Sequence, residues 1–167
     1  MRLHRAIPAF ALVLGGCRGP GSAFVSRADS MAAVIDGEVA TLLRDTALVS
    51  GPTAEGAFLE AHYQHDSLRR LRGSFLGGSG RATETYYFNP MLFLVVRADE
   101  RYDAPLSGRV RDSSSDRIYI ADGGVVRWVR RPASRGSLDS GTARRAADSI
   151  GAAARVLLAR IPRRQPM

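Results

Sequence analysis

The sequence predicts an α+β fold in which a helix at each end of the chain flanks a six-stranded antiparallel sheet. Apolar residues recur every three or four positions over 23–45 and over 140–161, which is the period of an amphipathic helix. Between 57 and 131 the pattern changes: ten of the twelve aromatic residues lie there, with many branched aliphatic residues and repeated turn signals, as in β-hairpins. The composition, 45% hydrophobic and 24% charged in 167 residues, is typical of a single globular domain.

The chain begins with the pattern of a secretory signal peptide. Met1–Arg5 is basic and is followed by an apolar stretch, Ala6–Leu14, which is shorter than the roughly 20 residues that a membrane-spanning helix requires. We therefore expect residues 1–16 to act as an export signal that is removed from the mature protein.

This signal ends in a short motif that contains the sole cysteine of the chain, Leu14-Gly15-Gly16-Cys17. The motif resembles the lipobox of bacterial lipoprotein precursors. The resemblance implies that the Cys17 thiol receives a diacylglyceryl group, that cleavage makes Cys17 the first residue, and that fatty acyl chains such as palmitate hold it in a membrane. The alternative is an ordinary secretory signal beside an unrelated cysteine. A single cysteine also excludes a disulfide framework and zinc sites built on several thiolates.

The same resemblance implies a location. The protein is expected to be exported and lipid-anchored in the cell envelope, with residues 17–22 as a short flexible tether between lipid and fold. Arg18 stands where an aspartate often signals retention in the inner membrane. The outer membrane, facing the periplasm, is therefore expected in a cell that has one.

The N-terminal helix is expected over 23–45. Its apolar face consists of six residues at spacings of three and four: Phe24, Ala28, Met31, Ile35, Val39 and Leu42. The cluster Ser50-Gly51-Pro52 ends any helical continuation.

Three hairpins of similar pattern predict a six-stranded meander over 57–131. In each hairpin a strand that contains a tyrosine leads into a tight turn and then into a second apolar strand. The expected turns are His65-Asp66, Asn89-Pro90 and Asp122-Gly123-Gly124. Met91–Val96 is apolar without alternation, which predicts a strand covered on both faces, with a helix as the cover. The stretch 99–116 is expected to be a long loop between hairpins, packed or mobile rather than a binding loop.

The C-terminal helix is expected over 140–161, where an alanine-rich apolar stripe ends at Pro162, and residues 162–167 form a basic tail. Most of the formal charge of +8 comes from residues 130–167, whose nine arginines face two acids: Arg130, Arg131, Arg135, Arg144, Arg145, Arg155, Arg160, Arg163 and Arg164. These arginines predict contact with an anionic envelope surface. The alternative is the compositional bias of a G+C-rich genome, since the chain has no lysine. Nucleic acid is not an expected partner for an exported protein.

Several segments of the mature part share a further pattern: Tyr86-Tyr87-Phe88, Leu92-Phe93-Leu94, Arg117-Ile118-Tyr119-Ile120 and Val126-Arg127-Trp128. With the N-terminal helix, they resemble uncharacterised lipoproteins of bacterial envelopes that have β-hairpin repeats. The resemblance implies the fold and the location, and it implies no activity.

One group of residues has the composition of a catalytic or metal site: Glu60, His62, His65 and Asp66. Glu60 and His62 share a strand face, whereas His65 joins them only if the turn takes it out of the pleat. The group would suit a metal- or carboxylate-dependent hydrolase. The alternative is that the histidines are solvated residues at a strand end.

The sequence therefore favours a lipid-anchored, non-catalytic binding or scaffolding module, and the hydrolase remains the alternative. No nucleophile elbow, phosphate-binding loop or cofactor motif stands out in the chain, and the favoured prediction includes neither a cofactor nor a bound metal. The predicted binding residues are the aromatic residues of the hairpins, Tyr63, Tyr87, Tyr119 and Trp128, on a sheet face open to an unidentified protein partner.

Overall fold

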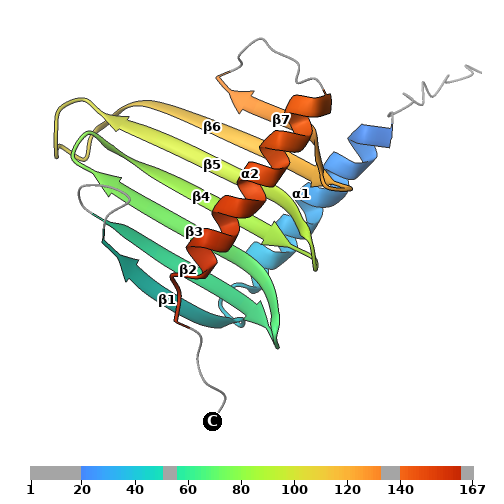
Figure 1. Cartoon of the computed structure of the whole chain (residues 1–167). Coiled ribbons are helices and arrows are strands. Elements are labelled where there is room, and N and C mark those ends of the chain that lie inside the picture. Colours follow the sequence, from blue (N-terminus) through green and yellow to red (C-terminus); the bar gives the residue numbers. More distant parts are fainter. Residues whose placement is uncertain (1–19, 51–55, 133–139, 163–167) are drawn as a thin grey trace, which may run out of the picture.

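The computed structural model describes residues 20–50, 56–132 and 140–162, and these form a seven-stranded antiparallel sheet with one helix on each face (Figure 1). The helices are α1 (Pro20–Glu38) and α2 (Ser140–Leu158). The strands are β1 (Leu43–Val49), β2 (Ala57–Gln64), β3 (Ser67–Gly77), β4 (Gly80–Phe88), β5 (Leu92–Tyr102), β6 (Val110–Ala121) and β7 (Gly124–Arg131).

The sheet is a meander in which each strand pairs with the next one along the chain, from β1 at one edge to β7 at the other. The α+β class and the three hairpins are confirmed, since β2–β3, β4–β5 and β6–β7 turn where the sequence predicts. His65 and Asp122 adopt positive φ angles of 53° and 51° in two of these turns.

The predicted count of six strands is wrong, because the expected helix 23–45 ends at Glu38 and β1 follows it. Val39 and Leu42 continue the apolar spacing of the helix, so the sequence does not show that the helix ends at Glu38. The chain turns there because both the amide and the hydroxyl of Thr41 donate hydrogen bonds to the Glu38 carbonyl, at 2.9 and 2.8 Å. From Leu43 onward the backbone forms an antiparallel pair with β2, in a register that places Leu43 opposite Tyr63 and Val49 opposite Ala57.

The expectation of a long loop over 99–116 is also wrong, because most of this stretch forms strands. Strand β5 extends to Tyr102 and β6 begins at Val110, so that 103–109 alone connects them. This part of the sheet lies beyond both helices, and its strands therefore carry polar residues instead of the apolar alternation by which strands are usually recognised.

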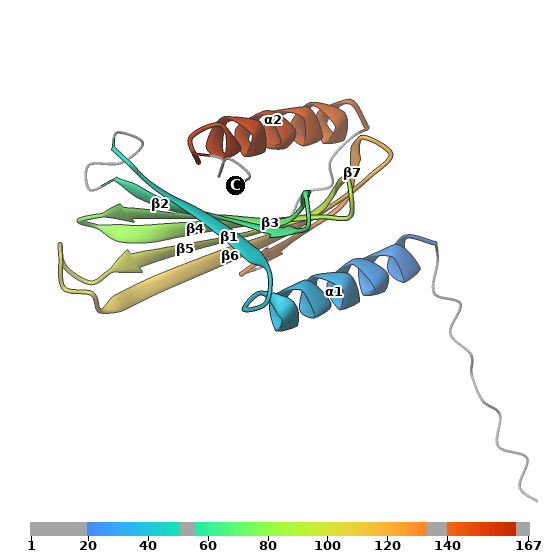
Figure 2. The ribbon, with the colours of Figure 1, turned by 90° about the horizontal axis from the view of Figure 1, so that it is seen from below.

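Each helix covers its own face of the sheet and has its own apolar cluster (Figure 2). Helix α2 contributes Ala147, Ile150 and Ala154 to a cluster with Leu59, Leu71, Tyr86, Val95 and Ile118. Helix α1 contributes Ala28, Ala32 and Ile35 to a cluster with Tyr87, Phe93, Leu94 and Tyr119. Burial of apolar surface stabilises such layers by about 25 cal/mol per Å². All members of both buried clusters lie between Ala28 and Ile161, so a chain that begins at Cys17 contains the entire described core.

Strand β5 shows why the apolar run over 91–96 needed cover on both sides. Successive strand residues point to opposite faces. Leu94 is fully buried in the α1 cluster, and its neighbour Val95 is fully buried in the α2 cluster. The prediction of a doubly covered strand is therefore confirmed.

Both helices cross the strands obliquely. Asp29, in the middle of α1, contacts β6, and Asp36, near its end, contacts β3 and β4. Within the described part of the chain, neither helix has the combination of length and hydropathy that crossing a membrane would take.

Candidate functional site

The predicted histidine and acid group is divided by the structure. Glu60 and His62 lie on the α1 side of β2, as the strand alternation predicts, whereas His65 and Asp66 occupy the exposed turn that follows. Among the described residues, no three histidine, cysteine or acidic side chains gather closely enough to hold a metal ion. Glu60 lies 3.7 Å from Arg44 in an ion pair.

His62 is the buried member of this group. Its side chain is 4% exposed, its Nδ1 atom has no hydrogen-bond partner, and its cross-strand neighbours are Arg44 and Arg70. Burial, with Arg70 as the next cause, lowers the pKa of His62. The imidazole is therefore neutral near pH 7. It is buried beside arginines on β1 and β3, whereas His65 lies in the exposed turn, so the two histidines do not form one site.

The predicted aromatic binding residues do not form one surface. Tyr87 and Tyr119 lie under α1, where their hydroxyls donate hydrogen bonds of 2.9 Å to Asp36 and Asp29. Burial and the Asp36 carboxylate raise the pKa of Tyr87 to about 12, so that it keeps its proton and remains a donor. Tyr63 and Trp128 pack against the other cluster, on the α2 side.

A row of alternating charges crosses four strands on the α2 side, beyond the end of the apolar cluster. Its members are Glu84 on β4, Arg97 on β5, Asp116 on β6 and Arg130 on β7, which occupy paired register positions. Arg97 lies 3.0 Å from Glu84, and Arg130 donates two hydrogen bonds of 2.7 Å to Asp116. The Arg130 guanidinium holds the pKa of the Asp116 carboxyl below its usual value. Tyr86 donates a hydrogen bond to Glu84, which ties the row to the core.

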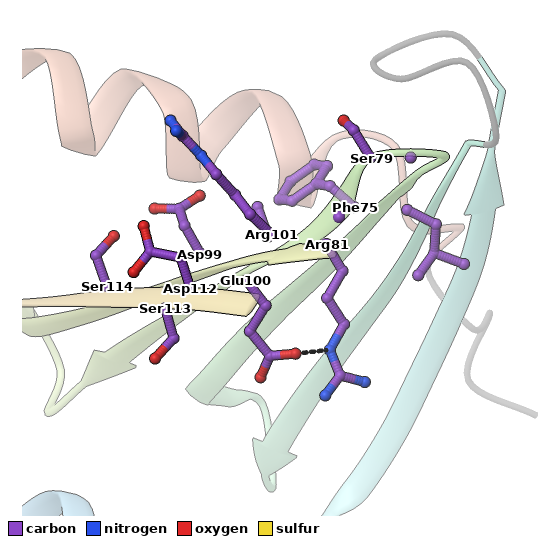
Figure 3. Close-up of a pocket in the computed structure, with 13 residues that line it drawn as sticks. Phe75, Ser79, Arg81, Asp99, Glu100, Arg101, Asp112, Ser113 and Ser114 are labelled. Atoms are coloured by element: carbon purple, nitrogen blue, oxygen red, sulfur yellow. Dashed lines mark hydrogen bonds and ion pairs between the residues drawn. The ribbon is translucent and has the colours of Figure 1, made fainter. Parts of the chain in front are cut away.

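An open cleft of about 560 Å³ lies past this row, where the sheet extends beyond both helices (Figure 3). We call it the end cleft. It is lined by the β3–β4 turn, the end of β5 and the start of β6, and its side chains include Phe75, Arg81, Asp99, Glu100, Arg101 and Asp112.

The end cleft wraps around the sheet, because its lining residues alternate between the two faces. Arg101 and Asp112 are cross-strand partners on the α2 side, and Arg81 donates a 2.8 Å hydrogen bond to Glu100 on the α1 side (Figure 3). Gly80 permits the close approach of β4 to β5: a Cβ atom there would lie 2.0 Å from the Glu100 carbonyl oxygen. The cleft thus offers donors and acceptors of both charges beside the Phe75 ring, a set that suits a polar, uncharged or zwitterionic ligand.

A second cleft, of about 660 Å³, lies between the first half of α1 and the strands β5–β7. We call it the helix cleft. Its polar lining consists of Ser22, Ser26 and Asp29 from α1, Ser115, Arg117 and Tyr119 from β6, and Arg127 and Arg131 from β7. Arg117 donates a 2.6 Å hydrogen bond to Asp29 and a 3.1 Å hydrogen bond to Tyr119.

Of two exposed arginines in the helix cleft, Arg131 belongs to the basic C-terminal segment predicted to contact an anionic surface, whereas Arg127 was not predicted as part of a site. Arg127 and Arg131 alternate with Val129 along β7 and are exposed on the α1 side. Within the described ranges neither has an ion-pair partner. Strand alternation alone places them on one face, but the position of α1 beside them depends on tertiary packing.

The C-terminal arginines do not form a single surface. Arg130 belongs to the charged row and Arg131 to the helix cleft, while Arg144, Arg145, Arg155 and Arg160 are exposed on or just after α2. Arg135, Arg163 and Arg164 lie outside the described residues, as does Cys17 with the predicted signal.

Comparisons of this chain with protein-family models, with curated proteins and with solved structures found no match. The features of this chain that point to a function are the two clefts, one at each end of the layered structure, and the motif that precedes α1.

Proposed function

We propose that this chain is an exported lipoprotein of the cell envelope, acylated on Cys17, whose folded body is a non-catalytic binding module that holds its ligand in the end cleft. In a cell with two membranes, the protein lies on the outer membrane and faces the periplasm. The body works at the membrane surface without crossing it.

The observation that carries this proposal is the position of the sole cysteine, directly after Leu14-Gly15-Gly16 and three residues before Pro20, where α1 begins. Three residues of extended chain span at most about 11 Å. An acyl group on Cys17 therefore keeps the start of α1 within about one helix diameter of the lipid surface.

The end cleft lies away from that anchor. The middle of α1 packs beside Tyr119, whereas Asp112 lines the end cleft, and both residues belong to β6. Seven residues of strand separate them, which corresponds to about 23 Å at 3.3 Å per residue. The ligand site is thereby displayed toward the aqueous side of the membrane.

The charges near the end cleft support binding rather than acid–base catalysis. Glu84, Glu100 and Asp116 are each engaged by an arginine, at 3.0, 2.8 and 2.7 Å. The Arg130 guanidinium lowers the pKa of the Asp116 carboxyl, whereas a general acid at neutral pH needs a raised pKa. Ion-paired acids of this kind hold a surface in one shape and offer fixed hydrogen-bond acceptors.

The anchoring half of the proposal is tested in the producing cell with the variant Cys17→Ser. We expect the wild type to incorporate a labelled fatty acid and to sediment with membranes, and the variant to lose both properties. The matched control is the double variant Cys17→Ser, Ser30→Cys, which restores one thiol at an exposed position of α1. Labelling of that control, or membrane retention of unlabelled Cys17→Ser, contradicts the proposal.

The binding half is tested on the acylated protein in vesicles. Saccharides and short peptides are screened for changes in the amide NMR signals of residues 99–101 and 112–114. We expect a ligand that shifts these signals to lose affinity in Arg101→Ala and to keep it in Arg155→Ala, a control on α2. A ligand whose signals map to other surfaces contradicts the assignment of the end cleft.

A further inference from the structure

We infer that the helix cleft binds the phosphate group of an anionic phospholipid in the membrane that holds Cys17. The inference rests on the proposed lipid anchor and extends it, because it assigns a second membrane contact to named residues of the folded body.

The charge of the helix cleft is the first reason. Three guanidinium groups, from Arg117, Arg127 and Arg131, face one carboxylate, Asp29, which leaves the cleft cationic. Arginine stays protonated at all relevant pH values and binds phosphate oxygens through its forked donors. Asp29 engages Arg117 at 2.6 Å and so fixes one side of the cleft, while Arg127 and Arg131 are exposed.

The second reason is the position of the cleft relative to the anchor. Ser22 and Ser26, which line the cleft, lie in the first two turns of α1. Ser22 is five residues after Cys17 in the sequence. An acylated Cys17 therefore holds the cleft at the depth of the lipid head groups, where anionic surface charge attracts nearby cations.

The third reason is the apolar part of the lining. Val25, Val96 and Val129 contribute to the same cleft from α1, β5 and β7. A phospholipid presents a charged phosphate close to its apolar acyl chains, and the cleft offers arginines next to valines. The helix cleft lies on the α1 side of the sheet, whereas the arginines of α2 lie on the opposite face (Figure 2).

The experiment uses the mature chain 17–167 with Cys17→Ser, which contains the entire described core and has no acyl group. Binding is measured by co-sedimentation with phosphatidylcholine vesicles and with vesicles in which one third of the lipid is phosphatidylglycerol. We expect binding to the anionic vesicles, and a loss of about thirtyfold in partition coefficient in Arg127→Ala, Arg131→Ala, since each cation near such a surface contributes about 1 kcal/mol.

The matched control is Arg155→Ala, Arg160→Ala, which removes the same charge from α2 and is expected to change the partition coefficient far less. A second pair, Arg127→Gln, Arg131→Gln, is expected to match the alanine pair, and thermal unfolding checks that all variants are folded. Equal losses in the α2 control overturn the inference in favour of net charge. Equal binding to both vesicles overturns it as well, and so does inorganic phosphate that binds as tightly as the anionic vesicles, which would indicate a site for free phosphate.

The two proposals fail separately. Loss of acyl labelling in the cell would remove the anchor, whereas loss of vesicle selectivity in the unacylated chain would remove the phospholipid site alone.

Discussion

His62 is the residue whose surroundings oppose its protonation most directly. It is 4% exposed, and its cross-strand neighbours Arg44 and Arg70 are both cationic. Because its pKa is lowered in the folded protein, the unfolded chain binds more protons than the folded one between the lowered pKa and about 6.5. The free energy of unfolding therefore falls as the pH drops below about 6.5, by at most about 1.4 kcal/mol per pH unit from this group.

This prediction is checked by denaturant unfolding at pH values above and below the ordinary histidine pKa. We expect His62→Gln to flatten the pH dependence of the unfolding free energy in this range. His65→Asn is the matched control, because His65 is exposed and asparagine tolerates its φ of 53°. A flattened profile in the control, or an unchanged one in His62→Gln, would show that another group is responsible.

At this scale the sequence predicts which residues share a face and not what covers that face. Strand alternation correctly places Glu60 and His62 together. It does not indicate that Tyr87 and Tyr119 serve as hydrogen-bond donors to α1, because that role depends on where the helix crosses the sheet. The aromatic residues chosen as binding residues are therefore divided between the two buried layers.

Among the elements, β4 and β5 depend on a glycine where they approach at the end cleft. A Cβ atom on Gly80 would lie 2.0 Å from the Glu100 carbonyl oxygen, which is backbone and cannot rotate away. We expect Gly80→Ala to force the strands apart and to reduce the free energy of unfolding by about 1–3 kcal/mol, as overpacking does. Faster amide exchange at the paired Arg101 is expected as well.

The matched control is Gly77→Ala, its register partner across the β3–β4 turn. There the nearest atom to an added Cβ lies 3.6 Å away, an ordinary contact. We expect this variant to unfold with a smaller change and to leave exchange at Arg101 unaltered. Equal destabilisation by the two substitutions would mean that glycine flexibility in the turn matters more than the close approach.

Elements with a strong local signal were predictable, and those defined by their partners were not. The three hairpins combine turn residues with apolar strands, and the structure contains all three. Strand β1 was missed because its residues follow a helix without a clear stop signal and gain strand geometry by pairing with β2. The polar end of β6 was missed because no helix covers it, so its alternation carries no apolar pattern.

For the whole molecule, the arrangement of two helices on opposite faces explains why the sheet has two different ends. Near the start of α1 the exposed charges of the helix cleft are predominantly positive, whereas the end cleft carries both signs. The sequence indicated that residues 130–167 are basic but could not assign their arginines to surfaces. That assignment requires the path of β7 beside α1 and of α2 on the far side.

Two membrane contacts of different physical origin should respond differently to salt. The contribution of acyl chains grows with buried CH₂ groups, at about 0.8 kcal/mol each, and salt screens it little. The attraction of arginines to lipid phosphate is screened, since the Debye length falls from about 10 Å at 0.1 M salt to about 3 Å at 1 M. We therefore expect 1 M salt to release the unacylated mature chain from anionic vesicles and to leave the acylated protein bound.

Co-sedimentation of both forms over a salt series measures this difference, and Arg127→Ala, Arg131→Ala supplies the comparison within each form. In the acylated protein we expect this double variant to remain bound to membranes. We also expect its helix cleft to be more exposed to solvent, measured as faster amide exchange in β7. Release of the acylated protein by salt would contradict an acyl anchor. Salt-resistant binding of the unacylated chain would instead indicate that the valines of the helix cleft, and not its arginines, provide most of the attraction to lipid.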